Sequence, residues 1–133
     1  MTSRRPGRQA GSTTIEVAVL FPAFLTLLFA GVQAAEWYHT RNLCLAAARD
    51  GVRVARTTTG DVPAGVAAAR RFLARTGQDF VSDVHVDGAG SGPTVVRITV
   101  TATAPRILPL PGLVLRVTQT AQAGEERFTP DSP

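Results

Sequence analysis

Hydrophobic positions are concentrated near the N-terminus of the chain. Residues 17–35 form a run of 19 in which Gln33 is the one strongly polar side chain. A helix of that length spans about 28 Å, close to the ~30 Å hydrocarbon core of a bilayer. A chain of 133 residues is too small to enclose such a helix in a globular core. The pattern predicts a transmembrane helix, which we assign to residues 12–35.

The flanks of this run predict its orientation. Residues 1–12 carry three arginines and no acid, a local charge of +3, and their proline and glycines disfavour a helix as far as Gly11. Positive charge is retained on the cytoplasmic side of membranes, so we expect a cytoplasmic N-terminus and an exported remainder. Trp37 and Tyr38 follow the run, where aromatic rings favour the interface.

The helical period continues beyond the apolar run, and the chain offers no break signal before the three threonines that precede Gly60. A helix over residues 14–57 would be roughly 65 Å long. We interpret Cys44 as a small core residue, because no histidine or acid motif frames it as a nucleophile. A second face carries arginines expected to be solvated, one of which can pair with Asp50. The predicted buried stripe consists of Trp37, Leu43, Ala47, Gly51, Val54 and Ala55.

A second, shorter helix is predicted after Gly60. Asp61 suits its N-cap, Pro63 its first turn and Gly77 its end. Its predicted apolar face consists of Val66, Ala69, Phe72 and Leu73.

In three segments near the C-terminus apolar and polar side chains alternate as they do in strands. These segments are residues 80–87, 94–104 and 113–123. The predicted inward side chains are Phe80, Val84 and Val86 in the first, Val96, Ile98, Val100 and Ala102 in the second, and Leu113, Leu115 and Val117 in the third. Residues 88–93 read as a loop, and three prolines between the last two strands enforce an extended connection. The fold class is therefore α+β, with an exported domain over residues 36–123 and a disordered polar tail over residues 124–133.

Composition offers little material for catalysis or nucleic-acid binding. All 14 basic residues are arginine and the net charge is +4; because arginine without lysine indicates a G+C-rich coding bias, we do not take the charge as a nucleic-acid signal. A single cysteine excludes an intrachain disulfide and a multi-cysteine metal site. Asp83, His85 and Asp87 share a strand face about 7 Å apart, and we interpret them as a polar surface. We expect no enzyme activity, cofactor, metal or small-molecule substrate.

Glu16 does not fit a plain membrane anchor. It lies at the start of the apolar run, where an unpaired carboxylate at membrane depth costs about 2–3 kcal/mol or more. One interpretation places Glu16 at the headgroups, in contact with water. The other assigns it a partner in an assembly.

The second interpretation comes from a resemblance. The segment GSTTIE at residues 11–16, preceded by arginines and followed by an apolar helix, resembles the class III signal peptide of type IV pilins. In that family a prepilin peptidase cuts after the glycine, here Gly11. The mature chain would begin at Ser12, with Glu16 as its fifth residue. The new amine and the Glu16 carboxylate would then pair between neighbouring subunits.

The whole chain resembles the TadE-like family, pseudopilin-like components of tight-adherence (Tad/Flp-type) pilus systems that serve cell adhesion. Two segments carry this resemblance. One is the Ala- and Arg-rich continuation of the long helix, AAARDGVRVA at residues 46–55. The other is a Pro-rich stretch that leads into the last strand, LPLPGLVLRVTQTAQA at residues 108–123. It implies a pilin-like fold, residence in the cell membrane and then in a pilus, and a role as structural or assembly subunit. The implied partners are a prepilin peptidase, sibling pilins or pseudopilins, the Tad secretion machinery and the bilayer. Many pilins begin with an aromatic residue, so Ser12 favours a minor pilin or a pseudopilin subunit.

Two alternatives remain open at this stage. Small residues before Ala35 imitate a signal-peptide cut after Ala34, which would release a secreted domain. The chain also fits an unprocessed single-pass membrane protein whose exported domain binds another protein.

Overall fold

The computed structural model describes residues 10–57 and 59–124, with side chains from Thr14 onward. It contains helix α1 (Ala10–Ala55), helix α2 (Val62–Thr76) and strands β1 (Ser82–Asp87), β2 (Val95–Thr103) and β3 (Arg116–Gly124). The predicted α+β class, with one long helix, one short helix and three antiparallel strands, is confirmed. The predictions for residues 1–9 of the leader and 125–133 of the tail lie outside the described residues.

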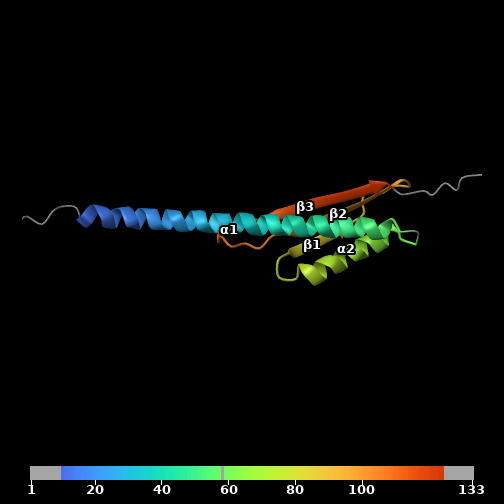
Figure 1. The fold of residues 1–133 in the computed structure, drawn as a ribbon, viewed down its shortest axis with the longest axis horizontal. Coiled ribbons are helices and arrows are strands. Elements are labelled where there is room, and N and C mark those ends of the chain that lie inside the picture. Colours follow the sequence, from blue (N-terminus) through green and yellow to red (C-terminus); the bar gives the residue numbers. More distant parts are fainter. Residues whose placement is uncertain (1–9, 58, 125–133) are drawn as a thin grey trace, which may run out of the picture.

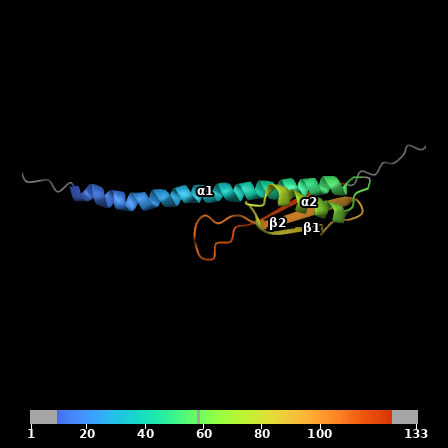
Figure 2. The same cartoon turned by 90° about the horizontal axis from the view of Figure 1, so that it is seen from below.

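Helix α1 determines the shape of the molecule. Its 46 residues form one rod, and only its C-terminal half is covered by the rest of the chain (Figures 1 and 2). We call the covered half, together with α2, the three strands and the described connections between them, the head. The helix begins at Ala10, so the prediction that Gly11 would keep the chain non-helical is wrong. A glycine costs only about 1 kcal/mol in a helix, and a long apolar helix tolerates that cost.

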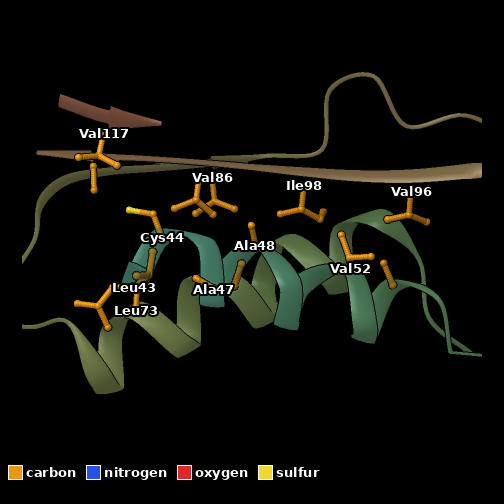
Figure 3. Close-up of a cluster of buried hydrophobic side chains, with 14 residues drawn as sticks. Leu43, Cys44, Ala47, Ala48, Val52, Leu73, Val86, Val96, Ile98 and Val117 are labelled. Atoms are coloured by element: carbon orange, nitrogen blue, oxygen red, sulfur yellow. The ribbon is translucent and has the colours of Figure 1, made fainter. Parts of the chain in front are cut away.

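The head has two layers. The strands form a sheet in the order β1-β2-β3, and both neighbouring pairs are antiparallel. Helices α1 and α2 lie side by side against one face of this sheet, and the core side chains fill the space between the layers (Figure 3). The predicted alternation of the central strand is confirmed by the four buried residues Val96, Ile98, Val100 and Ala102.

The buried stripe of α1 differs from the prediction near both of its ends. Trp37 is 38% exposed, because the stripe passes instead through Thr40, whose hydroxyl donates to the carbonyl of Phe80 at 3.2 Å. Val54 is half-buried, and Val52 is buried in its place. Val52 and Val54 both lie at three- or four-residue spacing from buried positions, so the period alone does not decide which of them is buried.

The start and end of α2 are as predicted. The carboxylate of Asp61 accepts from the backbone N–H of Ala64 at 2.7 Å, which is N-cap geometry. Pro63 lies in the first turn, and the N–H of Gly77 donates to the carbonyl of Leu73 at 2.8 Å. Leu73 and Ala69 are buried, while Val66 and Phe72 pack partly buried against the core.

The two helices make their closest approach at a pair of glycines. A Cβ on Gly51 would lie 2.8 Å from the carbonyl oxygen of Gly65, and a Cβ on Gly65 would lie 2.6 Å from that of Gly51. Real Cβ atoms are essentially never that close to a backbone oxygen. Glycine at both positions therefore allows α1 and α2 to pack backbone against backbone.

The outer strands begin later than predicted. In β1 the register shifts between Ser82 and His85, and Asp83 has a φ of 49°. This bulge breaks the predicted alternation: Val86 is buried, but Val84 and Phe80 are each 42% exposed. The third strand begins at Arg116, so its predicted first residues belong to the connection from β2. Of its predicted inward side chains, Val117 is buried, and Leu113 and Leu115 are half-buried.

Candidate functional site

The candidate site is the half of α1 that the head leaves uncovered. Ten of its large apolar side chains are between 42% and 73% exposed and Leu25 is half-buried; the ten are Ile15, Val17, Val19, Leu20, Phe21, Phe24, Leu27, Leu28, Phe29 and Val32. Within residues 10–57 and 59–124, α1 is the one helix long and apolar enough to cross a membrane. Such a surface is far larger than a soluble monomer leaves exposed to water, so it requires lipid or other helices around it.

Pro22 lies inside this half of the helix and removes one backbone donor from its ladder. The hydroxyl of Thr26 donates to the carbonyl of Pro22 at 2.8 Å. This bond gives the polar hydroxyl of Thr26 a partner within the apolar helix.

Glu16 lies on the exposed surface of α1, between the apolar side chains of Ile15 and Val17. Among the described side chains, no arginine or histidine lies within 4.0 Å of its carboxylate. The chain alone thus provides a carboxylate on an apolar helix, without an ion pair from the described side chains.

Gly11 and Ser12, the residues of the predicted cleavage site, lie in the first turn of α1. Their side chains are outside the described residues. Glu16 follows Ser12 by about one helical turn, a rise of roughly 6 Å. The two positions are therefore close enough to present an N-terminal group and a carboxylate at the same end of the rod.

Gln33 has a role that the sequence did not reveal. It is the one strongly polar residue of the apolar run, and it is only 7% exposed. Its amide donates to the carbonyl of Pro105 at 2.8 Å and accepts from the N–H groups of Ile107 at 2.7 Å and Leu108 at 3.3 Å. Gln33 thus fastens the connection between β2 and β3 to the end of the apolar run.

Several aromatic side chains lie on or against α1 just beyond Gln33. Trp37 and Tyr38 are 38% and 58% exposed. The ring of His39 meets that of Phe80 edge-on, with centroids 5.2 Å apart. Trp37 and Tyr38 are thus exposed at the end of the apolar run, and their position at the membrane interface stays a prediction.

Among the side chains that the structure describes, the reactive groups elsewhere show no catalytic arrangement. Cys44 is fully buried, as predicted for a core residue, and burial raises the pKa of its thiol to about 11. The bulge in β1 displaces Asp83, and the imidazole of His85 lies 3.7 Å from the carboxylate of Asp87. The described parts of the chain hold no group of three metal-ligating side chains.

Most of helix α1 matches a known protein family. Residues 11–53 match the model of the family described as TadE-like protein. This segment of the chain is therefore similar to TadE-like proteins. The match begins at Gly11 and therefore includes Ser12, Glu16 and the whole apolar run. It ends at Arg53, two residues before α1 ends.

The family match covers residues 11–53 and does not extend to the rest of the head. No curated protein and no solved structure matches the chain, and α2 and the sheet lie outside the TadE-like segment. The TadE-like family is one of structural pilus components and is not known as an enzyme family. Together with the apolar helix, the TadE-like segment fits a membrane protein related to tight-adherence pili.

Proposed function

We propose that the chain is a pseudopilin, a membrane-anchored structural or assembly subunit of an adhesive pilus of the tight-adherence type. Residues 1–11 act as a leader that a prepilin peptidase removes after Gly11. The mature subunit then begins at Ser12, with this end at the cytoplasmic face and the head on the other side of the membrane. Its partners are sibling pilins or pseudopilins and the tight-adherence secretion machinery.

One observation carries this proposal: the uncovered half of α1 exposes ten large apolar side chains and has a single carboxylate, Glu16, at its beginning. A plain anchor needs the apolar surface but gains nothing from the carboxylate. A subunit that leaves the bilayer for a bundle of helices uses both, because the same surface packs against neighbours and the carboxylate meets a cation there.

The cation is the amine of Ser12 from a neighbouring subunit. In a dry helix bundle the pair is desolvated, and deletion of one member of such a pair costs about 3–5 kcal/mol. If Glu16 instead lay among headgroups and water, an ion pair would contribute only about 0–1 kcal/mol. The two environments therefore predict different effects for the same substitution.

The test is self-crosslinking in membranes that contain the peptidase and the sibling pilins. A cysteine introduced by Val19→Cys in a Cys44→Ala background reports contact between the apolar halves of neighbouring helices. Glu16→Ala should lower the crosslinked fraction by about tenfold or more, with membrane insertion and leader removal unchanged.

Glu36→Ala is the matched control, since it removes a carboxylate from the same helix just beyond the apolar run. It should leave crosslinking unchanged. Equal crosslinking in the Glu16→Ala variant and the parent would contradict the proposal. It would favour the alternative of a single-pass anchor with a protein-binding head.

A further inference from the structure

The connection between β2 and β3 is the part of the head nearest the uncovered half of α1. We call residues 105–115 the proline loop. Figures 1 and 2 show it in orange, protruding beyond the sheet toward the N-terminal half of the helix. Its tip turns at Gly112, whose φ of 78° suits the third position of a type II turn after Pro111. The N–H of Leu113 donates to the carbonyl of Leu110 across this turn at 3.3 Å.

The hydrogen bonds of Gln33 determine the height of this loop along α1. They hold the backbone of Pro105, Ile107 and Leu108 level with the last turn of the apolar run. Trp37 and Tyr38, about one turn farther along, are exposed on the same helix. If residues 17–35 span a bilayer, the proline loop lies at the boundary between acyl chains and headgroups.

The side chains of the loop suit that boundary. Ile107, Leu110 and Val114 are exposed by 39%, 53% and 65%, which is unfavourable in water. Arg106 is exposed beside them, and residues 105–115 contain no acid. Apolar side chains next to a cation match the chemistry of an anionic phospholipid surface.

Part of the loop backbone also needs no hydrogen bond to water. Three of its eleven residues are prolines, which have no N–H to leave without a partner. The N–H groups of Ile107 and Leu108 donate to Gln33, and those of Leu110 and Leu113 donate to carbonyls within the loop. Irregular backbone is excluded from the hydrocarbon itself, so this loop suits the headgroup region.

We propose that the proline loop is a second membrane contact, which inserts Ile107, Leu110 and Val114 among the lipid headgroups on the side of the bilayer that faces the head. The inference rests on the membrane anchor in the proposed function. The loop and α1 then hold the membrane at two points, and this restricts how far the head can tilt before the subunit is extracted.

The test measures the depth of single fluorescent labels in the full-length protein, reconstituted into vesicles of phosphatidylcholine and phosphatidylglycerol. Three variants in a Cys44→Ala background carry the label: Leu110→Cys in the loop, Val19→Cys in the apolar run and Ala89→Cys in the distant loop between β1 and β2. Nitroxide groups attached near the headgroup or in the middle of the acyl chain serve as quenchers.

The shallow nitroxide should quench the label at Leu110→Cys several-fold more than the label at Ala89→Cys. The deep nitroxide should quench Val19→Cys most strongly. Equal quenching at Leu110→Cys and Ala89→Cys, with Val19→Cys still quenched, would overturn the loop proposal and leave the anchor standing. An unquenched Val19→Cys would overturn the anchor itself.

A second copy of the chain is the competing occupant of this surface. In that case the label at Leu110→Cys would be shielded from the nitroxide in crowded vesicles and would become accessible as lipid is added in excess. Quenching that does not depend on the ratio of protein to lipid supports the lipid contact, and quenching that depends on it in this way contradicts the contact.

Discussion

The side chain of Gln33 accepts a hydrogen bond from the backbone N–H of Ile107 at 2.7 Å, across 74 residues of sequence. One partner belongs to the apolar run of α1 and the other to the proline loop. The head is therefore attached to the end of the run by a side chain as well as by the continuous helix. This attachment holds the proline loop of the head at the level along α1 where the apolar surface ends.

The first prediction concerns this attachment. Gln33→Leu keeps the apolar character of the run but leaves the N–H groups of Ile107 and Leu108 without their acceptor. These N–H groups are partly buried, and a buried donor without a partner costs about 1–3 kcal/mol, so the proline loop should open more often. Amide hydrogen exchange over residues 105–115 should become about tenfold faster or more, while exchange in β2 remains unchanged.

Thr26→Val is the matched control for this substitution. It also removes a polar side chain from the apolar run, but the bond that it deletes lies within α1. Exchange in the proline loop should not respond to it. If Gln33→Leu and Thr26→Val give the same exchange rates in the loop, the hydrogen bonds of Gln33 do not hold it.

The second prediction concerns the helix crossing. In Gly51→Ala the new methyl group meets the carbonyl oxygen of Gly65, which belongs to a packed backbone and cannot move aside. Overpacking of this kind costs about 1–3 kcal/mol. Thermal unfolding of the detergent-solubilised protein should show a midpoint lowered by several degrees.

Gly92→Ala supplies the comparison for this measurement, because a Cβ there meets nothing within 4 Å. It should leave the unfolding midpoint close to that of the parent. A Gly51→Ala variant as stable as Gly92→Ala would mean that α1 and α2 do not approach as closely as described.

The third prediction concerns Cys44 and pH. Burial raises the pKa of its thiol from 9.0 to about 11. Between these values the unfolded chain releases the thiol proton while the folded chain retains it. The free energy of unfolding should therefore fall as pH rises through this window, by about 2–3 kcal/mol at most.

Denaturant unfolding at a series of pH values checks this dependence. Cys44→Ala lacks the titrating group, so its stability should decline less over the same pH range. Parallel pH profiles for the two proteins would show that the thiol is not buried in the folded state.

Much of the head could be predicted from local patterns. The strict alternation from Val96 to Ala102 identified the central strand, because a strand with one buried face has a period of two. Asp61 and Gly77 marked the ends of α2 correctly, since capping depends on residues within one turn. These features need no information from distant parts of the chain.

The parts that were missed depend on distant contacts. Gln33 stood out as polar in the run, but its partners lie more than 70 residues away and are backbone groups of a loop. The glycine pair of the helix crossing also has no local signature. The bulge at Asp83 shifted β1 and broke an alternation that looked regular from Phe80 onward.

The candidate site was the part of the molecule that could be predicted most fully from the sequence. Apolar length, the arginines before it and the position of Glu16 are all visible in a linear reading. The structure adds that this half of α1 remains uncovered by the described head. The partner of Glu16 lies in another molecule in our proposal, so a single chain does not contain it.

The fourth prediction concerns topology. The arginine-rich leader predicts that the head lies outside the cytoplasm. An Ala89→Cys variant in a Cys44→Ala background should react with a membrane-impermeant maleimide once the outer envelope layers are opened. Reaction only after permeabilisation of the inner membrane would reverse the orientation.

The central claim is that this chain is a processed subunit, and the mass of the mature protein tests it most directly. Protein isolated from membranes that contain an active prepilin peptidase should have lost residues 1–11 and should begin at Ser12. Gly11→Val should prevent the cut, because a β-branched side chain is bulky where the peptidase is expected to need glycine. An intact mass that retains the leader in the parent protein, or an N-terminus at Ala35, would contradict the account.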